Sequence, residues 1–136
     1  MKLTLRSEYA LLALLFLARH GSKDLVSVAV IAKAQDIPLS FCHKILRKLV
    51  AAGLVASRTG RSGGFRLARR PAAIRLLDVF TTIQGPPAVT HCMLKVDPCP
   101  RRRHCPASRK WQGLQDSILS FLKTTTLADI AESGAA

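Results

Sequence analysis

The chain has 136 residues, a length that fits a single domain with one projecting element. Lys and Arg number 21 against 8 acidic residues, so the net charge is +13. This excess is spread along the chain and predicts a polyanionic partner, with nucleic acid favoured over an anionic membrane surface. No Cys-x-x-Cys pair, Gly-rich nucleotide loop or His/Asp/Ser constellation is present, so the sequence indicates neither an enzyme nor a small-molecule substrate.

An apolar run from Tyr9 to Ala18 predicts a buried first helix that ends near Arg19, with Gly21 placed to stop it. The run is about half as long as the ~20 apolar residues that a membrane-spanning helix needs. Basic residues before the run could also open a signal peptide, but Glu8 stands where the apolar region of a signal would begin. We therefore expect a cytoplasmic protein with no membrane contact, in which cysteines favour metal over disulfides.

Two further helices are predicted on either side of the tight turn Asp36-Ile37-Pro38. The first is a short helix that is capped by Ser27 and runs through Ala34. The second is capped by Ser40 and ends before Gly53. Two helices joined by a tight turn are typical of a helix-turn-helix.

The second helix of this pair has apolar residues at the spacing of one buried stripe. These are Cys42, Ile45, Leu46, Leu49 and Val50. We interpret Cys42 as a core residue, because a free cysteine on an apolar face behaves as a small hydrophobe. The opposite face is polar and cationic, as a recognition helix in the major groove requires. Its residues are Ser40, Phe41, His43, Lys44, Arg47 and Lys48.

Residues 54–68 predict a two-stranded hairpin, because apolar positions alternate on both sides of a Gly-rich turn. Arginines surround the tip, and the glycines would let the backbone approach a phosphate closely. The order helix, helix, hairpin predicts a winged helix-turn-helix. The expected DNA contacts of the hairpin are Arg58, Thr59, Arg61, Ser62 and Gly63.

A fourth helix with Leu76 and Phe80 on its buried face is predicted to end at Gly85, and a long last helix begins near Ser108. The last helix has an apolar stripe that is too extensive to remain bare: Trp111, Leu114, Ile118, Phe121 and Leu122. We expect it to pack against a second copy, which would place two recognition helices on a palindromic operator.

The expected fold is therefore mainly α with a small β-hairpin wing, built from five helical segments, one hairpin and one loop. We divide the chain into a winged helix-turn-helix domain at residues 1–85 and a cysteine-rich loop at residues 86–107. A dimerisation helix and C-terminal tail occupy residues 108–136.

The loop has the spacing Cys-x6-Cys-x5-Cys at Cys92, Cys99 and Cys105, interrupted by prolines and by the run Arg101-Arg102-Arg103. No packed helix or strand would accept this composition. Thiolates are ligands for iron–sulfur clusters and for zinc, and His91 or His104 could complete a zinc site. Free thiols or a labile disulfide are the remaining possibilities. The arginine run either binds phosphate or compensates the charge of an anionic cluster.

Several short motifs along the chain match one known family. They are Met1-Lys2-Leu3-Thr4, Ile31-Ala32-Lys33, Ile37-Pro38, Lys44-Ile45-Leu46, Leu49, Gly53-Leu54-Val55, Ser57-Arg58, Gly60, Gly63-Gly64-Phe65, Leu67-Ala68, Gly85-Pro86 and Thr126-Leu127-Ala128-Asp129-Ile130. Over nearly its whole length the chain resembles the Rrf-two family of bacterial winged-helix regulators, which includes IscR-like, NsrR-like and RirA-like members. Its three cysteines lie between the Gly-Pro pair and Trp111, as in the cluster-binding members.

The resemblance implies a dimeric DNA-binding regulator, usually a repressor. Its iron–sulfur cluster (2Fe-2S or 4Fe-4S) would report nitric oxide, redox state, or the supply of iron or clusters. The first cysteine spacing is one residue longer than is common in the family, so the loop geometry can differ. The alternative is a winged-helix regulator that has a structural zinc or no metal and senses by thiol oxidation.

The resemblance also implies a fourth cluster ligand. IscR-like members place a histidine three residues after the last cysteine, where this chain has Ser108. NsrR-like members use an acidic residue near the start of the first helix of the other subunit, and Glu8 matches that position. The head of a helix also favours a carboxylate without any such role. The implied ligands are Cys92, Cys99, Cys105 and Glu8 of the other subunit, with His104 and His91 as alternates.

Overall fold

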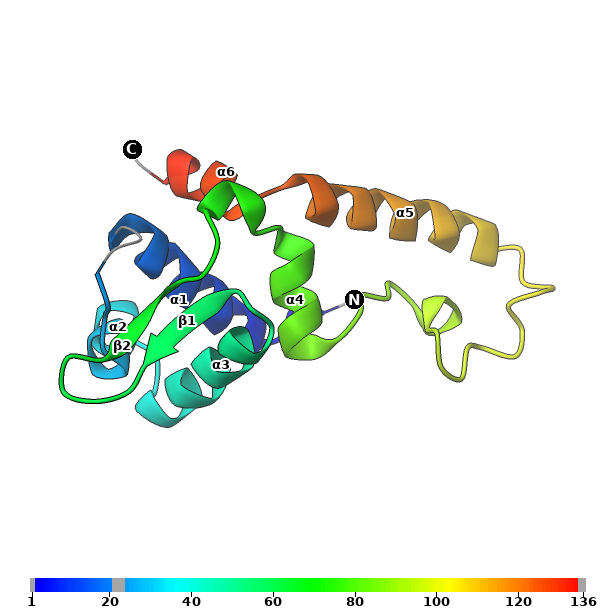
Figure 1. Ribbon diagram of the computed structural model, residues 1–136. Helices are drawn as coiled ribbons and strands as arrows, with labels where there is room; N and C mark the ends of the chain where they lie inside the picture. The colour runs from blue at the N-terminus through cyan, green and yellow to red at the C-terminus, as the bar shows by residue number, and fades with distance from the viewer. Residues whose placement is uncertain (1, 21–23, 135–136) are drawn as a thin grey trace.

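The computed structural model of the protein describes residues 2–20 and 24–134. Met1 and Gly21, which the sequence interpretation used, lie outside these ranges. The described residues form six α-helices and one antiparallel hairpin (Figure 1). They are α1 (Leu5–His20), α2 (Val28–Gln35), α3 (Leu39–Ala51), β1 (Val55–Arg58), β2 (Gly64–Leu67), α4 (Leu76–Gln84), α5 (Ser108–Thr124) and α6 (Leu127–Ser133), with short 3-10 turns at Pro71–Ala73 and His91–Met93. The predicted fold class, mainly α with a small wing, is confirmed.

The helix-turn-helix begins with the predicted cap. The side chain of Ser27 accepts a hydrogen bond from the backbone N–H of Val30 at the start of α2. Asp36 ends the helix in the left-handed backbone region, and Ile37 turns into the core, where its N–H donates to the carbonyl of Ala32 at 2.9 Å. The turn therefore sets α3 at a fixed angle to α2.

The start of α3 differs from the prediction. The helix begins at Leu39 directly after Pro38, whose carbonyl accepts the first helical hydrogen bond from Cys42. Ser40 lies within the first turn and does not cap the helix, so the expected cap is wrong. The physical reason is that the extended backbone of Pro38 already leads into the helix.

The wing pairs Val55 with Leu67 at its base and Arg58 with Gly64 near its tip. Sequence periodicity did not predict a further bridge, in which Val26 and Phe65 exchange two backbone hydrogen bonds of 2.9 and 2.8 Å. A Cβ on Gly64 would stand 2.7 Å from the carbonyl oxygen of Val26, so this close approach requires glycine. The bridge fixes the wing to the segment that leads into α2.

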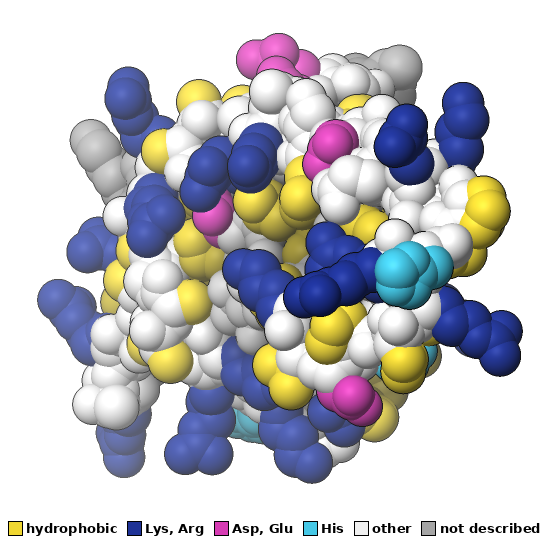
Figure 2. All heavy atoms as spheres, turned by 90° about the vertical axis from the view of Figure 1, so that its right-hand side faces the viewer, with side chains coloured by type: hydrophobic (Ala, Val, Ile, Leu, Met, Phe, Trp, Pro, Cys, Tyr) yellow, Lys and Arg dark blue, Asp and Glu magenta, His cyan; other side chains and the backbone are white. Residues whose placement is uncertain are grey.

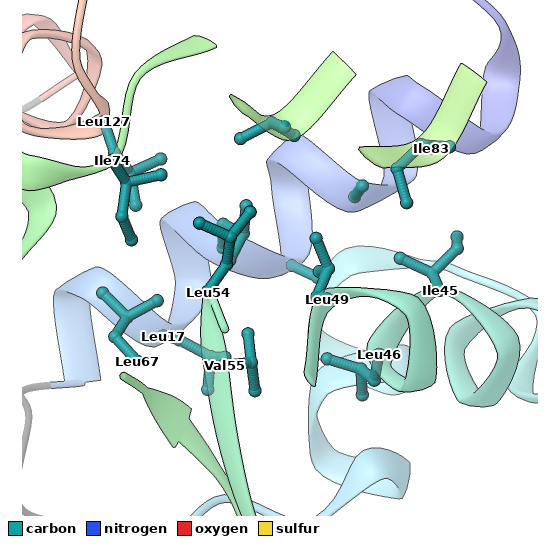
Figure 3. Packing of buried hydrophobic residues seen from close by; sticks show 14 of the residues in the cluster. Leu17, Ile45, Leu46, Leu49, Leu54, Val55, Leu67, Ile74, Ile83 and Leu127 are labelled. Atoms are coloured by element: carbon teal, nitrogen blue, oxygen red, sulfur yellow. The ribbon is translucent and has the colours of Figure 1, made fainter. Parts of the chain in front are cut away.

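The core lies between α1, α3, the base of the wing and α4 (Figure 3). Leu17 of α1, Leu49 of α3 and Leu54 before the wing are almost completely buried. Burial of each such side chain stabilises the fold by roughly 1.5–3 kcal/mol. The apolar stripes predicted for α3 and α4 face this core, because Ile45, Leu46 and Phe80 are buried with them.

The last helix, α6, corrects the expectation of five helical segments. It begins with a reciprocal capping box in which Thr126 and Asp129 bond to each other's backbone N–H. Leu127 is fully buried, and its N–H donates to the carbonyl of Ile74 at 2.8 Å. A helix of 7 residues is too short to show a reliable period, so the sequence predicts only a C-terminal tail here. Instead it packs against α1, and the chain returns to the core after α5.

None of the helices in the described part of the chain is long and apolar enough to cross a membrane.

Candidate nucleic-acid interface and cysteine loop

The exposed side of α3 carries the side chains predicted for a recognition helix. Ser40, His43, Lys44 and Arg47 are exposed. The opposite side of α3 is buried and includes Cys42, and burial raises the pKa of its thiol. Cys42 is therefore a neutral core residue, as expected. We call the exposed side of α3, including Lys48, the basic face.

Phe41 has a more specific environment than the sequence indicated. Its side chain is 37% exposed, and its ring lies 6.4 Å from that of Tyr9 on α1, centroid to centroid. The guanidinium carbon of Arg6 lies 5.6 Å from the Phe41 ring centroid, a favourable cation–aromatic arrangement. Phe41 therefore joins α3 to the start of α1, and Arg6 adds a positive charge beside the basic face.

The wing adds a second set of exposed polar residues. Arg58, Thr59, Arg61 and Ser62 are all exposed around the turn. The N–H of Gly63 donates to the carbonyl of Gly60 at 3.1 Å, and a Cβ on Gly63 would collide with the carbonyl of Arg58. The wing tip and α3 lie along the same side of the molecule, the lower side in Figure 1. One surface thus presents both elements.

The three loop cysteines occupy different environments. Cys92 is buried in the His91–Met93 turn, with its thiol and the Thr90 hydroxyl hydrogen-bonded at 2.8 Å. Cys99 and Cys105 are half-buried. The carbonyl of Cys105 accepts hydrogen bonds from the backbone N–H and the hydroxyl of Ser108 at the start of α5.

These cysteines do not form a ligand set in one chain. Across residues 2–20 and 24–134, no three His, Cys, Asp or Glu side chains are close enough together to hold a metal ion. Glu8 is exposed in the first turn of α1. His104 is exposed, and the ring Nε2 of His91 bonds to the carbonyl of Asp97 at 2.9 Å. The chemistry of the donors suits an iron–sulfur cluster, whose usual ligands are cysteine thiolates, and the loop would have to bring the three thiols together to hold one.

Two glutamines that the sequence interpretation missed fix the start of the loop: one bonds to its first residues, and the other bonds the end of α4, just before the loop, to α1. Gln115 of α5 is buried; its Oε1 accepts from the N–H of Val89 at 2.8 Å, and its Nε2 donates to the carbonyl of Pro87 at 2.7 Å. Gln84, the last residue of α4, accepts on its Oε1 from the Ser7 hydroxyl at 2.7 Å and from the N–H of Thr4 at 3.0 Å. Neither glutamine belongs to a recognisable motif, so the sequence gives no signal of these roles.

The apolar stripe of α5 is largely open in the single chain. Trp111, Leu114 and Phe121 are 41%, 42% and 62% exposed, whereas Leu122 is buried against the core. A helix that leaves its largest apolar residues in water has a face suited to a further partner.

Comparison with known proteins now identifies the kind of protein. A family described as "Rrf2: Iron-dependent Transcriptional regulator" matches residues 3–133. The chain belongs to this family. It is 35% identical to "Protein rrf2" of Nitratidesulfovibrio vulgaris over 130 residues, covering 96% of this chain and 87% of that protein. It is also 35% identical to the "HTH-type transcriptional regulator IscR" of Vibrio vulnificus over 130 residues, covering 96% of this chain and 77% of that protein.

Solved structures agree with the fold. The chain superimposes on CymR, described as the global cysteine regulator of B. subtilis, with a TM-score of 0.80 and 26% identity, covering 98% of both chains. IscR of T. potens gives a TM-score of 0.77 with 28% identity, covering 98% of this chain and 88% of that chain. The protein is thus an Rrf2-family, IscR-like transcriptional regulator with a winged helix-turn-helix, and its relatives are regulators rather than enzymes.

Proposed function

We propose that the protein is a cytoplasmic repressor that binds palindromic operator DNA as a homodimer. The observation that carries this proposal is the basic face of α3 beside an arginine-rich wing, in a chain whose family consists of transcriptional regulators. A cationic helix of this kind fits the major groove, and a neighbouring hairpin reaches the flanking backbone.

The interface residues divide by chemistry. Lys44 and Arg47 on α3, with Arg58 and Arg61 on the wing, are exposed cations that would neutralise phosphates. The remaining proposed contacts are polar or permit close approach: Ser40, Phe41, His43, Thr59, Ser62 and Gly63. Ser40 and His43 would meet base edges, whereas Phe41 would act through its contact with Arg6. Gly63 would act by shaping the turn.

The homodimer would form along α5. Its open stripe of Trp111, Leu114 and Phe121 is large, apolar and away from the core. A twofold contact along this helix would bury the stripe and set two basic faces about one helical turn of DNA apart, roughly 34–36 Å. Palindromic operators follow from that symmetry.

For the loop, we propose that Cys92, Cys99 and Cys105 hold an iron–sulfur cluster (2Fe-2S or 4Fe-4S), with Glu8 of the partner subunit as fourth ligand. When bound, such a group supplies a centre that reacts with nitric oxide and oxidants and ties three points of the loop together. As a ligand, the Cys92 thiolate could still accept a hydrogen bond from the Thr90 hydroxyl, whose oxygen lies 2.8 Å from its sulfur.

The chain has physical connections that would carry a change in the loop to the DNA-binding surface. Gln115 joins the beginning of the loop to α5, and Gln84 joins the end of α4 to the start of α1. The start of α1 in turn touches α3 through Arg6 and Phe41. A shift of a few kcal/mol between two loop arrangements changes DNA affinity by orders of magnitude.

The second candidate is a regulator with a structural zinc, or one that holds no metal and senses through its thiols. The separated positions of the three cysteines favour the metal-free form of this candidate, since the described residues form no metal site without rearrangement. Zinc would additionally require His91 or His104 as fourth ligand.

Iron and acid-labile sulfide per chain, measured after anaerobic purification together with the visible spectrum, separate the two candidates. For the cluster-binding candidate we expect equal amounts of iron and sulfide per chain, and charge-transfer bands in the visible spectrum. Colourless protein with zinc or with no metal, even after anaerobic reconstitution, would contradict the cluster and leave the DNA-binding proposal unchanged.

A further inference from the structure

An open pocket of about 670 Å³ lies between the cysteine loop and the first turns of α5. Cys99, Arg102, Arg103 and Arg109 line it, together with Ser108 and Gln112, and no acidic residue does. We call it the arginine pocket. Within residues 2–20 and 24–134 none of these three arginines is in an ion pair. Three guanidinium groups around one concave surface therefore create a positive field without an internal counter-charge.

The position of the pocket favours a small anion over DNA. The loop lies at the far end of α5 from the wing and α3 (Figure 1), so the pocket is away from the elements proposed to hold DNA. Figure 2 looks onto this end of the molecule, where Lys and Arg side chains surround hydrophobic ones. A concave site of this size suits a compact polyanion, and guanidinium groups bind carboxylates in bidentate pairs.

The three loop thiols differ in access to the pocket. Cys99 is half-buried and lies in the pocket wall. Cys92 is buried and hydrogen-bonded to Thr90, and neither it nor Cys105 lines the pocket. An anion that is held by the arginines would therefore meet the sulfur of Cys99 and no other.

We propose that, in the chain without a metal group, the arginine pocket binds carboxylate-bearing low-molecular-weight disulfides and directs thiol–disulfide exchange to Cys99. The Cys99 sulfur, as thiolate, attacks one sulfur of the disulfide. The S–S bond of the small molecule breaks as the new S–S bond to Cys99 forms, and one small thiolate leaves with the electron pair. The leaving thiolate takes up the proton that the Cys99 thiol gave to water when it ionised. Cys99 is oxidised and the small disulfide is reduced. This inference deepens the metal-free candidate of the proposed function and concerns the chain only while no cluster is bound to Cys99.

The test follows exchange on the full-length, reduced and metal-free chain by intact mass and peptide mapping. Glutathione disulfide is the anionic probe and 2-hydroxyethyl disulfide is the neutral one. We expect the anionic probe to form its first adduct on Cys99. The rate of this reaction should be unchanged in Cys105→Ser, and the reaction should be absent in Cys99→Ser. The variant Arg102→Gln/Arg103→Gln should react ~10-fold more slowly with the anionic probe and at an unchanged rate with the neutral one. Arg101→Gln is the matched control, because Arg101 belongs to the same run but does not line the pocket.

The wild-type chain provides a test that needs no variant: added salt should slow exchange with the anionic probe only. First labelling of Cys92 or Cys105, or equal slowing of both probes in the double variant, would overturn the proposal. So would a double variant that loses operator affinity while its exchange rate is unchanged, since the arginines would then belong to a DNA surface. Because the assay uses free thiols, its failure leaves operator binding and iron content untouched.

Discussion

The winged core and the cysteine loop are held in place by different physics. In the core, Leu14 and Leu49 are fully buried, and helix ends such as that at Thr126 are capped. In the loop, residues 94–98 are all exposed, and Val96 is 84% exposed. A segment that buries little has its conformation set by whatever binds it, so the loop is suited to sensing and the core to constant DNA geometry.

The largest difference between the two regions should appear in stability. Leu49→Ala removes a side chain that is 0% exposed and should lower the free energy of unfolding by about 2–5 kcal/mol. The matched loop change Val96→Ala should stay within about 0.5 kcal/mol, because that side chain is already in water. Urea denaturation followed by circular dichroism measures both. If Val96→Ala lowered the free energy of unfolding as much as Leu49→Ala does, the loop and the winged core would not differ in this way.

The junction between the regions should show an intermediate effect. Gln115→Ala removes two hydrogen bonds to the backbone at Pro87 and Val89, at a cost of about 1–3 kcal/mol. Hydrogen exchange should become faster in the first half of the loop and remain unchanged in α3. Gln112→Ala is the control, because its amide bonds to Asp116 on the same helix and, among the described residues, to no backbone group of the loop. If hydrogen exchange of the loop amides is unchanged in Gln115→Ala, the two hydrogen bonds of Gln115 do not position the loop.

On the DNA-binding side, Lys44→Gln should weaken binding to all duplex sequences and reduce the slope of log affinity against log salt by about one unit. Arg101→Gln in the loop removes the same charge at a site away from the basic face, and its slope should equal that of the wild type. Fluorescence anisotropy over a series of salt concentrations measures the slope. If Lys44→Gln and Arg101→Gln reduce the salt slope equally, net charge governs binding and the basic face does not.

The smallest expected effect is an acid-dependent one at the surface of the winged core, where Arg75 and Asp78 meet at the start of α4. Partial burial acts to raise the pKa of Asp78, but hydrogen bonds from the side chain and backbone N–H of Arg75, and its charge, outweigh this and lower the pKa. The stabilisation is therefore present above the unfolded-state pKa and is lost as pH falls through the lower folded-state value. Asp78→Asn should cost up to about 1 kcal/mol at neutral pH. The difference in unfolding midpoint between Asp78→Asn and the wild type should vanish in acid. A difference that stays constant with pH would mean that the charge of Asp78 does not stabilise the fold.

Much of the winged core could be predicted from the sequence because burial leaves a period in it. The stripe of α3 through Cys42 and Leu49, and the alternation around the Gly-rich turn, identified these elements and their ends. The cap at Ser40 was wrong because the turn residue Pro38 starts the helix earlier. Helix α6 was missed because seven residues give no reliable period, although the Thr126 and Asp129 pair had the spacing of a capping box.

The candidate site was predictable only in its chemistry. Exposed cations on one helical face follow from the same period, but the contact of Phe41 with Tyr9 and Arg6 joins residues far apart in the chain. The roles of Gln84 and Gln115 and the arginine pocket beside Cys99 likewise depend on long-range placement. A loop of prolines and arginines has no local pattern that fixes its path, so the separation of its thiols could not be foreseen.

The most direct test of the account compares operator affinity of anaerobically reconstituted and metal-free protein, in the wild type and in Cys92→Ser/Cys99→Ser/Cys105→Ser. We expect about a tenfold or larger difference between the two wild-type states, a single affinity for the variant in both, and the same unfolding midpoint for variant and wild type. A variant that keeps the wild-type difference, or that no longer folds, would contradict the claim that the loop senses while the winged core recognises DNA.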